Sequence, residues 1–327
     1  MPVRHAILVA VTLLSAPAGR GAPLVIAHRG ASGYLPEHTL EAKAVAHAQA
    51  ADFVEQDVVL SRDDVPVVLH DLYLDAVSDV AEVYPGRSRD DGRFYALDFT
   101  LAELRRLRLS ERLDPRTGRQ LHPGRFPAGT GRFQIVTLAE ELEFLAGLDR
   151  STGRRTGVYP EIKRPAWHRD AGRDISPIVL RVLREHGFAT KADACFLQCF
   201  DADEVRRLRH DLGWEGRLVQ LVGEVADGGP DPLLATGALD DLAAIADGLG
   251  VPLARVVDPA GRPTGLVDAA HRAGLVVHAY TFRRDRLPAF ATDADTALRL
   301  VFVAAGVDGL FSDFPDVCVD WLRTARR

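Results

Sequence analysis

The chain has 327 residues, with 40 Lys and Arg against 46 Asp and Glu, a formal net charge of -6 and a hydrophobic fraction of 47%. This composition is that of an ordinary globular protein, which excludes a disordered chain, a collagen-like repeat and a disulfide scaffold. Because acidic residues outnumber basic ones, the sequence shows no excess of positive charge to bind a nucleic-acid backbone. We therefore expect a small-molecule partner and no nucleic acid.

Residues 1–22 differ in character from the rest of the chain. A basic start at Arg4 precedes an apolar run over 6–14, and an Ala-x-Ala motif ends at Ala18. This order predicts a signal peptide cleaved after Ala18 or Ala22, although a short N-terminal helix would also fit. No later stretch has the roughly 18 apolar residues of a membrane span. We therefore expect an exported protein, periplasmic or secreted, without stable membrane insertion.

The three cysteines carry no disulfide signal. Cys195 and Cys199 lie four positions apart in a segment typical of a strand. Four residues of strand separate them by about 13 Å, which is too far for a bridge. We expect both, and Cys318 in the last helix, to be small buried apolar residues.

From residue 23 onward, short β-rich runs alternate with amphipathic segments, a pattern that predicts an α/β fold with a parallel sheet. The nine expected strands are 24–27, 53–59, 65–69, 157–162, 195–200, 218–222, 254–257, 275–280 and 309–312. The expected helices are 39–50, 137–147, 175–186, 202–212, 239–247, 264–273 and 295–305. Two pairs have the spacing of helix caps, Thr137 with Glu140 and Asp201 with Glu204.

The second and third strands are joined only by residues 60–64. A parallel crossover needs about a dozen residues, so we expect an antiparallel hairpin here. Eight parallel strands remain, and with their helices they predict a (β/α)8 TIM barrel in one domain over 23–327. The alternation of predicted strands and helices stops between residues of about 72 and 134. This segment is rich in Gly, Pro, Arg and Asp and contains one clear helix, 101–109. We expect an insertion after the hairpin that follows strand 2, too short and too polar to bury a separate core.

Polar residues at the carboxyl ends of barrel strands are the first candidates for chemistry, because TIM-barrel active sites lie at that end. These residues are His28, Arg29, Glu55, Asp57, His70, Glu161, Lys163 and Gln198. Glu55 and Asp57 stand at i and i+2 and must face the same side of their strand.

A third carboxylate, Glu161, ends the neighbouring parallel strand and would join Glu55 and Asp57 in one cluster. Such a cluster repels itself unless a cation is bound. Since all the ligands are oxygens, a hard divalent ion, Ca²⁺ or Mg²⁺, is the natural solution. The alternative is that one carboxylate is protonated or pairs with Lys163 or Arg29.

The hairpin brings a histidine to the same place. A turn centred on Arg62 and Asp63 would place His70 opposite Glu55. His28, after the first strand, would face the same volume. Two histidines beside a metal and an arginine meet the needs of phosphodiester cleavage, which are a cationic cradle for the phosphate, a base and an acid.

Six sequence blocks, in their order and spacing, resemble the glycerophosphodiester phosphodiesterase family, most closely its bacterial periplasmic branch. The blocks are HRGASGYLPEHTLEA, EQDVVLSRDDVPVVLHD, YPEIKRP, LQCFDADE, VVHAYTFR and GVDGLFSDFPD, and the resemblance runs from about Leu24 to Trp321. It implies a distorted TIM barrel that hydrolyses glycerophosphodiesters to sn-glycerol 3-phosphate and an alcohol. It also implies a divalent cation, with Ca²⁺ favoured and Mg²⁺ possible.

The resemblance implies a role for each matching residue. His28 and His70 match the general acid and base, Arg29 the phosphate-binding arginine, Glu55, Asp57 and Glu161 the metal ligands, and Lys163 a phosphate or charge-balancing partner. Gln198, Tyr280 and Phe282 match substrate-binding positions. In the family the glycerol 2-hydroxyl attacks phosphorus and gives a cyclic phosphate that water opens. Which histidine acts first as the base stays open.

Two other functions remain as alternatives. A phospholipase D-like lyase on intact lipids would share the histidines and carboxylates but would need an apolar rim, whereas the insertion is mostly charged. A non-catalytic binding protein for phosphate esters would need the cation but not the pair of histidines. The preferred alcohol head group and the oligomeric state are open as well.

Overall fold

The computed structural model describes residues 21–225 and 231–325. Of the predicted signal peptide, residues 1–20 therefore lie outside the described residues. Among the helices of the described ranges, none combines the length and the apolar character that crossing a membrane requires.

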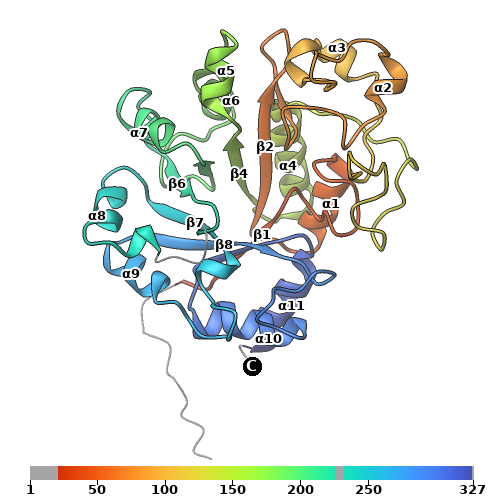
Figure 1. The fold of residues 1–327 in the computed structure, drawn as a ribbon. Helices are drawn as coiled ribbons and strands as arrows, with labels where there is room; N and C mark the ends of the chain where they lie inside the picture. Colours follow the sequence, from red (N-terminus) through yellow and green to blue (C-terminus); the bar gives the residue numbers. More distant parts are fainter. Residues whose placement is uncertain (1–20, 226–230, 326–327) are drawn as a thin grey trace, which may run out of the picture.

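Eight parallel strands close into a barrel surrounded by helices, so the predicted (β/α)8 barrel is confirmed (Figure 1). The strands are β1 (Leu24–Ala27), β2 (Phe53–Leu60), β4 (Gly157–Ile162), β5 (Phe196–Cys199), β6 (Arg217–Leu221), β7 (Gly248–Pro252), β8 (Val276–Phe282) and β9 (Gly309–Ser312). Their order is β1-β9-β8-β7-β6-β5-β4-β2, and pairing of β1 with β2 closes the ring. The ninth strand, β3 (Pro66–Val68), pairs antiparallel with β2.

The principal helices cover the outside of the barrel. They are α1 (Leu40–Ala48), α4 (Leu138–Thr152), α5 (Pro165–Asp170), α6 (Ile175–Glu185), α7 (Ala202–His210), α8 (Ala238–Ala243), α9 (Leu266–Arg272), α10 (Ala294–Leu298) and α11 (Pro315–Ala325). Both predicted caps are confirmed. Thr137 and Glu140 form a reciprocal capping box on α4, and the Asp201 side chain accepts from the first backbone N–H groups of α7. After α10 the chain continues as a π-helical segment, Arg299–Ala304.

One predicted strand, 254–257, was wrong. The strand lies at Gly248–Pro252, and Leu253–Arg255 is a 3₁₀ turn. Gly-Leu-Gly-Val-Pro is poor in strand-forming residues, which hides the strand in the sequence. The glycine at 250 lies close against a neighbouring strand, because an added Cβ would come within 2.4 Å of Leu221 Cδ2 and that side chain would have to move.

The hairpin is confirmed, but its predicted register was wrong by one position. Val58 pairs with Val68, and continuing this register would set His70 opposite Gln56 rather than Glu55. The strand ends at Val68, two residues before His70. The chain turns after the hairpin and places His70 in the cavity at the end of the barrel.

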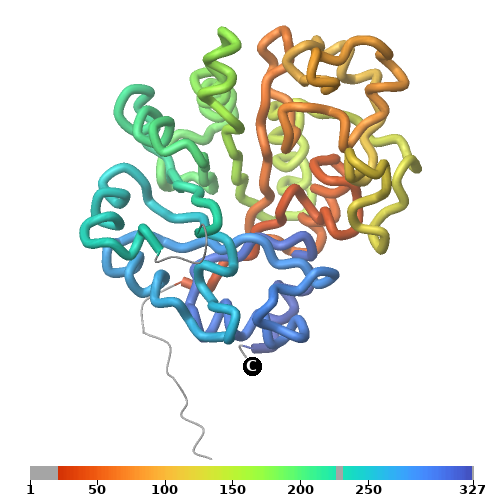
Figure 2. The backbone as a smooth tube through the Cα atoms, viewed as in Figure 1, coloured from red at the N-terminus to blue at the C-terminus, as the bar shows by residue number. Residues whose placement is uncertain are grey.

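The segment after the hairpin packs on one side of the barrel, drawn from orange to yellow in Figure 2. It holds only the short helices α2 (Val80–Val83) and α3 (Leu101–Leu104) and a 3₁₀ turn at Ala96–Asp98, so the predicted helix 101–109 was wrong beyond its first turn. The expectation that this segment buries no core of its own was also wrong. Phe99, Leu104 and Leu107 belong to a separate buried cluster, which the hairpin residues Val59 and Val67 complete.

The three cysteines are free and buried, as predicted.

Candidate active site

The cavity at the carboxyl ends of the strands lies next to a closed aromatic layer inside the barrel. This layer consists of Ile26, Phe53, Tyr159, Phe196, Val219 and Phe311. Because side chains alternate along a strand, the residue two positions further on enters the same interior one level higher. Glu55, Glu161 and Gln198 follow three members of the layer in this way and line a cavity of about 290 Å³.

The structure brings the three predicted carboxylates together. One oxygen from each of Glu55, Asp57 and Glu161 lies within 4.8 Å of the others, and all three residues are buried. Asp57 on β2 and Glu161 on β4 are register partners, which sets them at the same level of the barrel.

Burial and mutual repulsion perturb the pKa values of the three carboxylates in different directions. Burial raises the pKa of Glu161 to about 7, although Lys163 opposes the shift. Burial and then the charge of Asp57 raise the pKa of Glu55 well above its usual range. Burial also acts to raise the pKa of Asp57, but Lys163 and a hydrogen bond from His38 outweigh it and hold that pKa well below its usual range.

These residues fit a hard divalent cation. Asp57 Oδ1 and Gln198 Oε1 are buried acceptors with no hydrogen-bond partner among the described residues, which leaves oxygen ligands available beside the cluster. Gln198 Nε2 donates to Glu55 Oε1 at 3.1 Å, so its carbonyl oxygen is the free end of the amide. An all-oxygen donor set of this kind suits Ca²⁺ or Mg²⁺.

His28 is held by a buried aspartate. Its Nδ1 lies 2.6 Å from Asp313 Oδ1, and its Nε2 lies 3.8 Å from Glu55 Oε2. Asp313 also accepts from Arg125 and Arg283, at 2.7 and 2.8 Å. Burial acts to raise the pKa of Asp313, but His28 and the two arginines outweigh it and hold that pKa below its usual range. Burial and Arg29 lower the pKa of His28 to about 4, so the neutral ring donates from Nδ1 and leaves Nε2 unprotonated.

His70 is held in the same manner by a different pair of residues. Its Nδ1 lies 2.7 Å from Asp71 Oδ1, and Arg112 Nη1 donates to the other Asp71 oxygen at 2.6 Å. Burial and then Arg29 lower the pKa of His70. The cavity is therefore flanked by two imidazoles, and each is oriented by a carboxylate that an arginine neutralises.

Two cations face the cluster. Lys163 Nζ lies 2.8 Å from Glu161 and 3.6 Å from Asp57. Arg29 has a left-handed backbone (φ 59), and its amide donates to Glu55 Oε2 at 2.9 Å. Its guanidinium donates to Glu37 at 3.0 Å, but its Nε has no hydrogen-bond partner in the described part of the chain. Arg29 Nε also lies 3.5 Å from Asp57 Oδ2, so both cations border the carboxylates, and their role in binding phosphate stays a prediction.

The predicted aromatic pair divides between two environments. Tyr280 lines the cavity, and its hydroxyl donates to the carbonyl of Val222. Phe282 does not line the cavity. It is 1% exposed and packs in the main core, because the pairing of β8 with β9 shifts register between Ala279 and Phe282. The prediction of Phe282 as a substrate-binding residue was therefore wrong.

Several residues that orient the site were missed from the sequence. They are Asp313, Asp71, Arg283, Arg112, Arg125, Glu37 and His38. Asp71 directly follows His70, and Asp313 directly follows the last predicted strand. Their position just after predicted strands is the signal that could have identified both. Arg112 and Arg125 come from the irregular insertion, where no periodicity marks them.

A second cavity of about 650 Å³ adjoins the first. The two share His70, Glu161, Lys163 and Phe200 as lining residues. The rest of the second cavity includes the rings of Tyr73, from the insertion, and Trp167, on α5.

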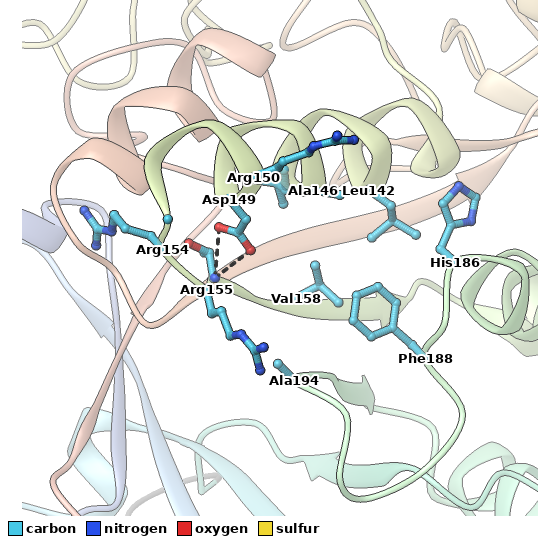
Figure 3. A pocket seen from close by; sticks show the side chains of 13 residues that line it. Leu142, Ala146, Asp149, Arg150, Arg154, Arg155, Val158, His186, Phe188 and Ala194 are labelled. Atoms are coloured by element: carbon cyan, nitrogen blue, oxygen red, sulfur yellow. Dashed lines mark hydrogen bonds between the residues drawn. The ribbon is translucent and has the colours of Figure 1, made fainter.

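A further cavity of about 560 Å³ lies between α4, the start of β4 and the segment after α6 (Figure 3). Among the described residues that line it, Asp149 is the one acid, and its carboxylate already accepts from the Thr156 amide and pairs with His47. The three carboxylates that could hold a metal ion lie instead at the carboxyl ends of the strands.

Comparisons with known proteins identify the family of the chain. The sequence model of the glycerophosphoryl diester phosphodiesterase family matches residues 28–317. The chain is 40% identical to the glycerophosphodiester phosphodiesterase of Haemophilus influenzae over 92% of this chain and 90% of that protein. It is 34% identical to that of Treponema pallidum over 91% of each. The crystal structure of a candidate glycerophosphoryl diester phosphodiesterase from Silicibacter pomeroyi has a TM-score of 0.70 and 27% identity, covering 94% of this chain and 96% of that chain.

Proposed function

This chain belongs to the glycerophosphoryl diester phosphodiesterase family and is a glycerophosphodiester phosphodiesterase, and we propose that it cleaves its substrates at the carboxylate cluster by histidine acid–base catalysis. The products are sn-glycerol 3-phosphate and an alcohol. The observation that carries the proposal is the position of two imidazoles, each held by its own aspartate, beside three buried carboxylates.

Glu55, Asp57 and Glu161 would hold a hard divalent cation, since the cluster consists of carboxylates and an adjacent amide oxygen, and the family resemblance favours Ca²⁺ over Mg²⁺. When bound, such an ion supplies positive charge that stabilises the phosphoryl oxygens in the transition state. Arg29 and Lys163 add their charges from the protein side.

His28 is the better candidate for the base in the first step. Its Nε2 is unprotonated and lies on the side of the carboxylates, whereas His70 stands where the two cavities meet. In the proposed step His28 takes the proton of the glycerol 2-hydroxyl as its oxygen bonds to phosphorus. His70, protonated with the anionic substrate in place, gives a proton to the departing alcohol oxygen.

The second step reverses these roles. His70 takes a proton from water as the water oxygen bonds to phosphorus, and His28 returns its proton to the 2-oxygen as the cyclic ester opens. Both imidazoles end in their starting protonation states. Asp313 and Asp71 keep the two rings oriented throughout, and each supports the imidazolium that forms transiently.

The larger cavity is the proposed place of the alcohol moiety. It adjoins the phosphate-facing residues His70 and Lys163, and it has room for a head group that the smaller, more polar cavity lacks. Phe200 stands at the junction with an exposed fraction of 47%, high for an aromatic ring. An aromatic face at this position suits the ammonium of choline or ethanolamine.

Export and membership of the periplasmic branch are also proposals, and the signal-like segment 1–22 supports them. N-terminal sequencing of the protein recovered from its native cell envelope tests them. Recovery of an N-terminus following Ala18 or Ala22 is expected, and an intact Met1 on all of the recovered protein would contradict export.

The activity is tested with purified protein and glycerophosphocholine, with glycerol 3-phosphate as the measured product. We expect activity that EDTA abolishes and that Ca²⁺ or Mg²⁺ restores, and we expect Glu161→Gln to require much more ion. The same assay with lysophosphatidylcholine addresses the alternative of a lyase on intact lipids. Turnover of the intact lipid in preference to glycerophosphocholine would favour that alternative, and full turnover in EDTA would remove the cation from the mechanism.

A further inference from the structure

Behind the carboxylate cluster, on the side away from the cavity, lie three buried residues with titratable side chains. Lys43 on α1 and Glu141 on α4 are both 0% exposed, and His38, which precedes α1, is 1% exposed. Figure 1 draws α1 and α4 next to β2, the strand that carries Glu55 and Asp57. None of the three residues is among those that line the cavity in the described part of the chain.

Lys43 uses all of its hydrogen-bonding capacity within this group. Its Nζ lies 2.9 Å from Glu141 Oε1 and 3.4 Å from His38 Nδ1, and it also donates to the backbone carbonyl of Glu55. An ammonium group has three donors and no acceptor. His38 Nδ1 must therefore be the acceptor of its contact with Lys43.

This contact determines the tautomer of His38. Since Nδ1 accepts from an ammonium group, it carries no proton, so the ring is neutral and has a single proton. With Nδ1 accepting from Lys43, that proton is on Nε2, which lies 2.8 Å from Asp57 Oδ2. Nε2 therefore donates to Asp57 Oδ2, and Asp57 Oδ1 remains the buried oxygen without a hydrogen-bond partner among the described residues.

The same group holds the rest of the cluster in place. By binding the Glu55 carbonyl, Lys43 fixes the backbone of a second carboxylate. Glu141 Oε1 also accepts from Gln56 Nε2 at 2.8 Å, and Gln56 Oε1 accepts from the Tyr159 amide at 3.0 Å. Gln56 thus ties β2 to β4, the strand that carries Glu161.

We propose that Lys43 and His38 form a buried positioning relay, which fixes the imidazole tautomer so that one oxygen of Asp57 is held and the other is presented to the cation. The inference rests on the proposed divalent centre. Lys43 and His38 touch neither substrate nor reacting atoms and are positioning residues. Outer contacts of this kind commonly change metal affinity by about 10- to 100-fold when they are removed.

A purely structural role makes a different prediction. Buried ion pairs contribute little net stability, and a neutral replacement of both partners is often tolerated. The double variant Lys43→Met, Glu141→Gln removes both charges, and the amide oxygen that it introduces on α4 can still accept from Gln56. We therefore expect this variant to fold and to bind the cation weakly, whereas a structural pair would change stability alone.

Two measurements test the relay. The first is ¹⁵N NMR of the imidazoles in the metal-free protein, which reports which nitrogen of His38 carries the proton. The second is calorimetric titration with Ca²⁺ of wild type, His38→Gln, His38→Leu, the double variant and His47→Leu. His47 is a matched control, because it lies on the same helix α1 and pairs with Asp149, which does not line the carboxylate cavity.

We expect protonation at Nε2 and at least about tenfold weaker Ca²⁺ binding in His38→Leu and in the double variant. His38→Gln, whose amide N–H can replace Nε2, should retain most of the affinity, and His47→Leu should retain all of it. Since His38 has a positive φ (62), both of its variants share the same backbone strain, and comparing them cancels it. A proton on Nδ1, or wild-type binding by His38→Leu, would overturn the relay. A wild type that binds neither Ca²⁺ nor Mg²⁺ would overturn the divalent centre itself, and the relay with it.

Discussion

His28 and Asp313 are 285 positions apart in the chain, yet Nδ1 of one lies 2.6 Å from Oδ1 of the other. Asp313→Asn keeps the shape of this contact and removes the charge that selects the Nδ1–H tautomer. We expect kcat to fall by about a hundredfold or more, with a smaller change in KM, because the base loses its orientation. Steady-state kinetics on glycerophosphocholine measure both.

The control for this substitution is Asp316→Asn in α11, whose carboxylate accepts from the Tyr34 hydroxyl and does not line the cavity. This variant should keep wild-type kcat. Equal activity of the two variants would show that Asp313 does not orient the base.

Glu111 provides a pH-dependent test of burial in the insertion. It is 4% exposed, and its Oε2 has no hydrogen-bond partner among the described residues. Burial raises its pKa to about 7, from a usual 4.5. Between these two values the folded chain binds more protons at this site than the unfolded chain, so this group makes the free energy of unfolding fall as pH rises.

Glu111→Gln removes that contribution. The variant should be more stable than wild type at pH 8, and the difference should shrink as pH falls through this window toward pH 4.5. Denaturant unfolding of both proteins at several pH values measures the difference in their free energies of unfolding. The contributions of the other acids cancel in this difference, because both proteins contain them. A stability difference that does not depend on pH would contradict the raised pKa.

Phe200 tests the proposed place of the alcohol. Phe200→Ala should raise KM for glycerophosphocholine about tenfold, since the ammonium loses an aromatic face, and should leave KM for the methyl ester of glycerophosphate nearly unchanged. Leu234→Ala is the matched control, because Leu234 is similarly exposed at 46% but lies outside both cavities. Equal KM changes for the two substrates would place the alcohol elsewhere.

The insertion core should matter for catalysis as well as for stability. Phe99 is buried in the cluster of the insertion, and Phe99→Ala should cost about 3 to 5 kcal/mol there. We expect proteolytic cleavage within residues 72–134 and a loss of activity, because Arg112 and Arg125 come from this segment. Phe302→Ala, in the main core against Trp321, should destabilise the barrel without this cleavage. An uncleaved insertion with full activity in Phe99→Ala would show that the active site does not depend on this buried cluster.

The sequence was sufficient for the parts of the site that depend on strand periodicity. Glu55, Asp57, Glu161 and Gln198 could be found because alternation along a strand determines which side chains enter the barrel. The hairpin followed from the length of its loop, and the cap at Thr137 from local hydrogen bonding.

Features that depend on irregular backbone could not be found in this way. The register shift in β8 sends Phe282 into the core, and a strict period of two does not foresee it. The arginines of the insertion reach their aspartates through loops that follow no period. The full burial of Lys43 on α1 also follows from tertiary packing, because a lysine on a helix is usually exposed.

The rings of Phe53, Tyr159, Phe196 and Phe311 fill the axis of the barrel beneath the carboxylates. Because packed aromatic side chains close the barrel at this level, substrate must enter and products must leave on the carboxyl-end side of the strands. The second cavity adjoins the first at Phe200, so at the proposed alcohol site the freed alcohol would have a path outward that does not cross the carboxylates. In the proposed two-step reaction, the alcohol would then leave first and sn-glycerol 3-phosphate second.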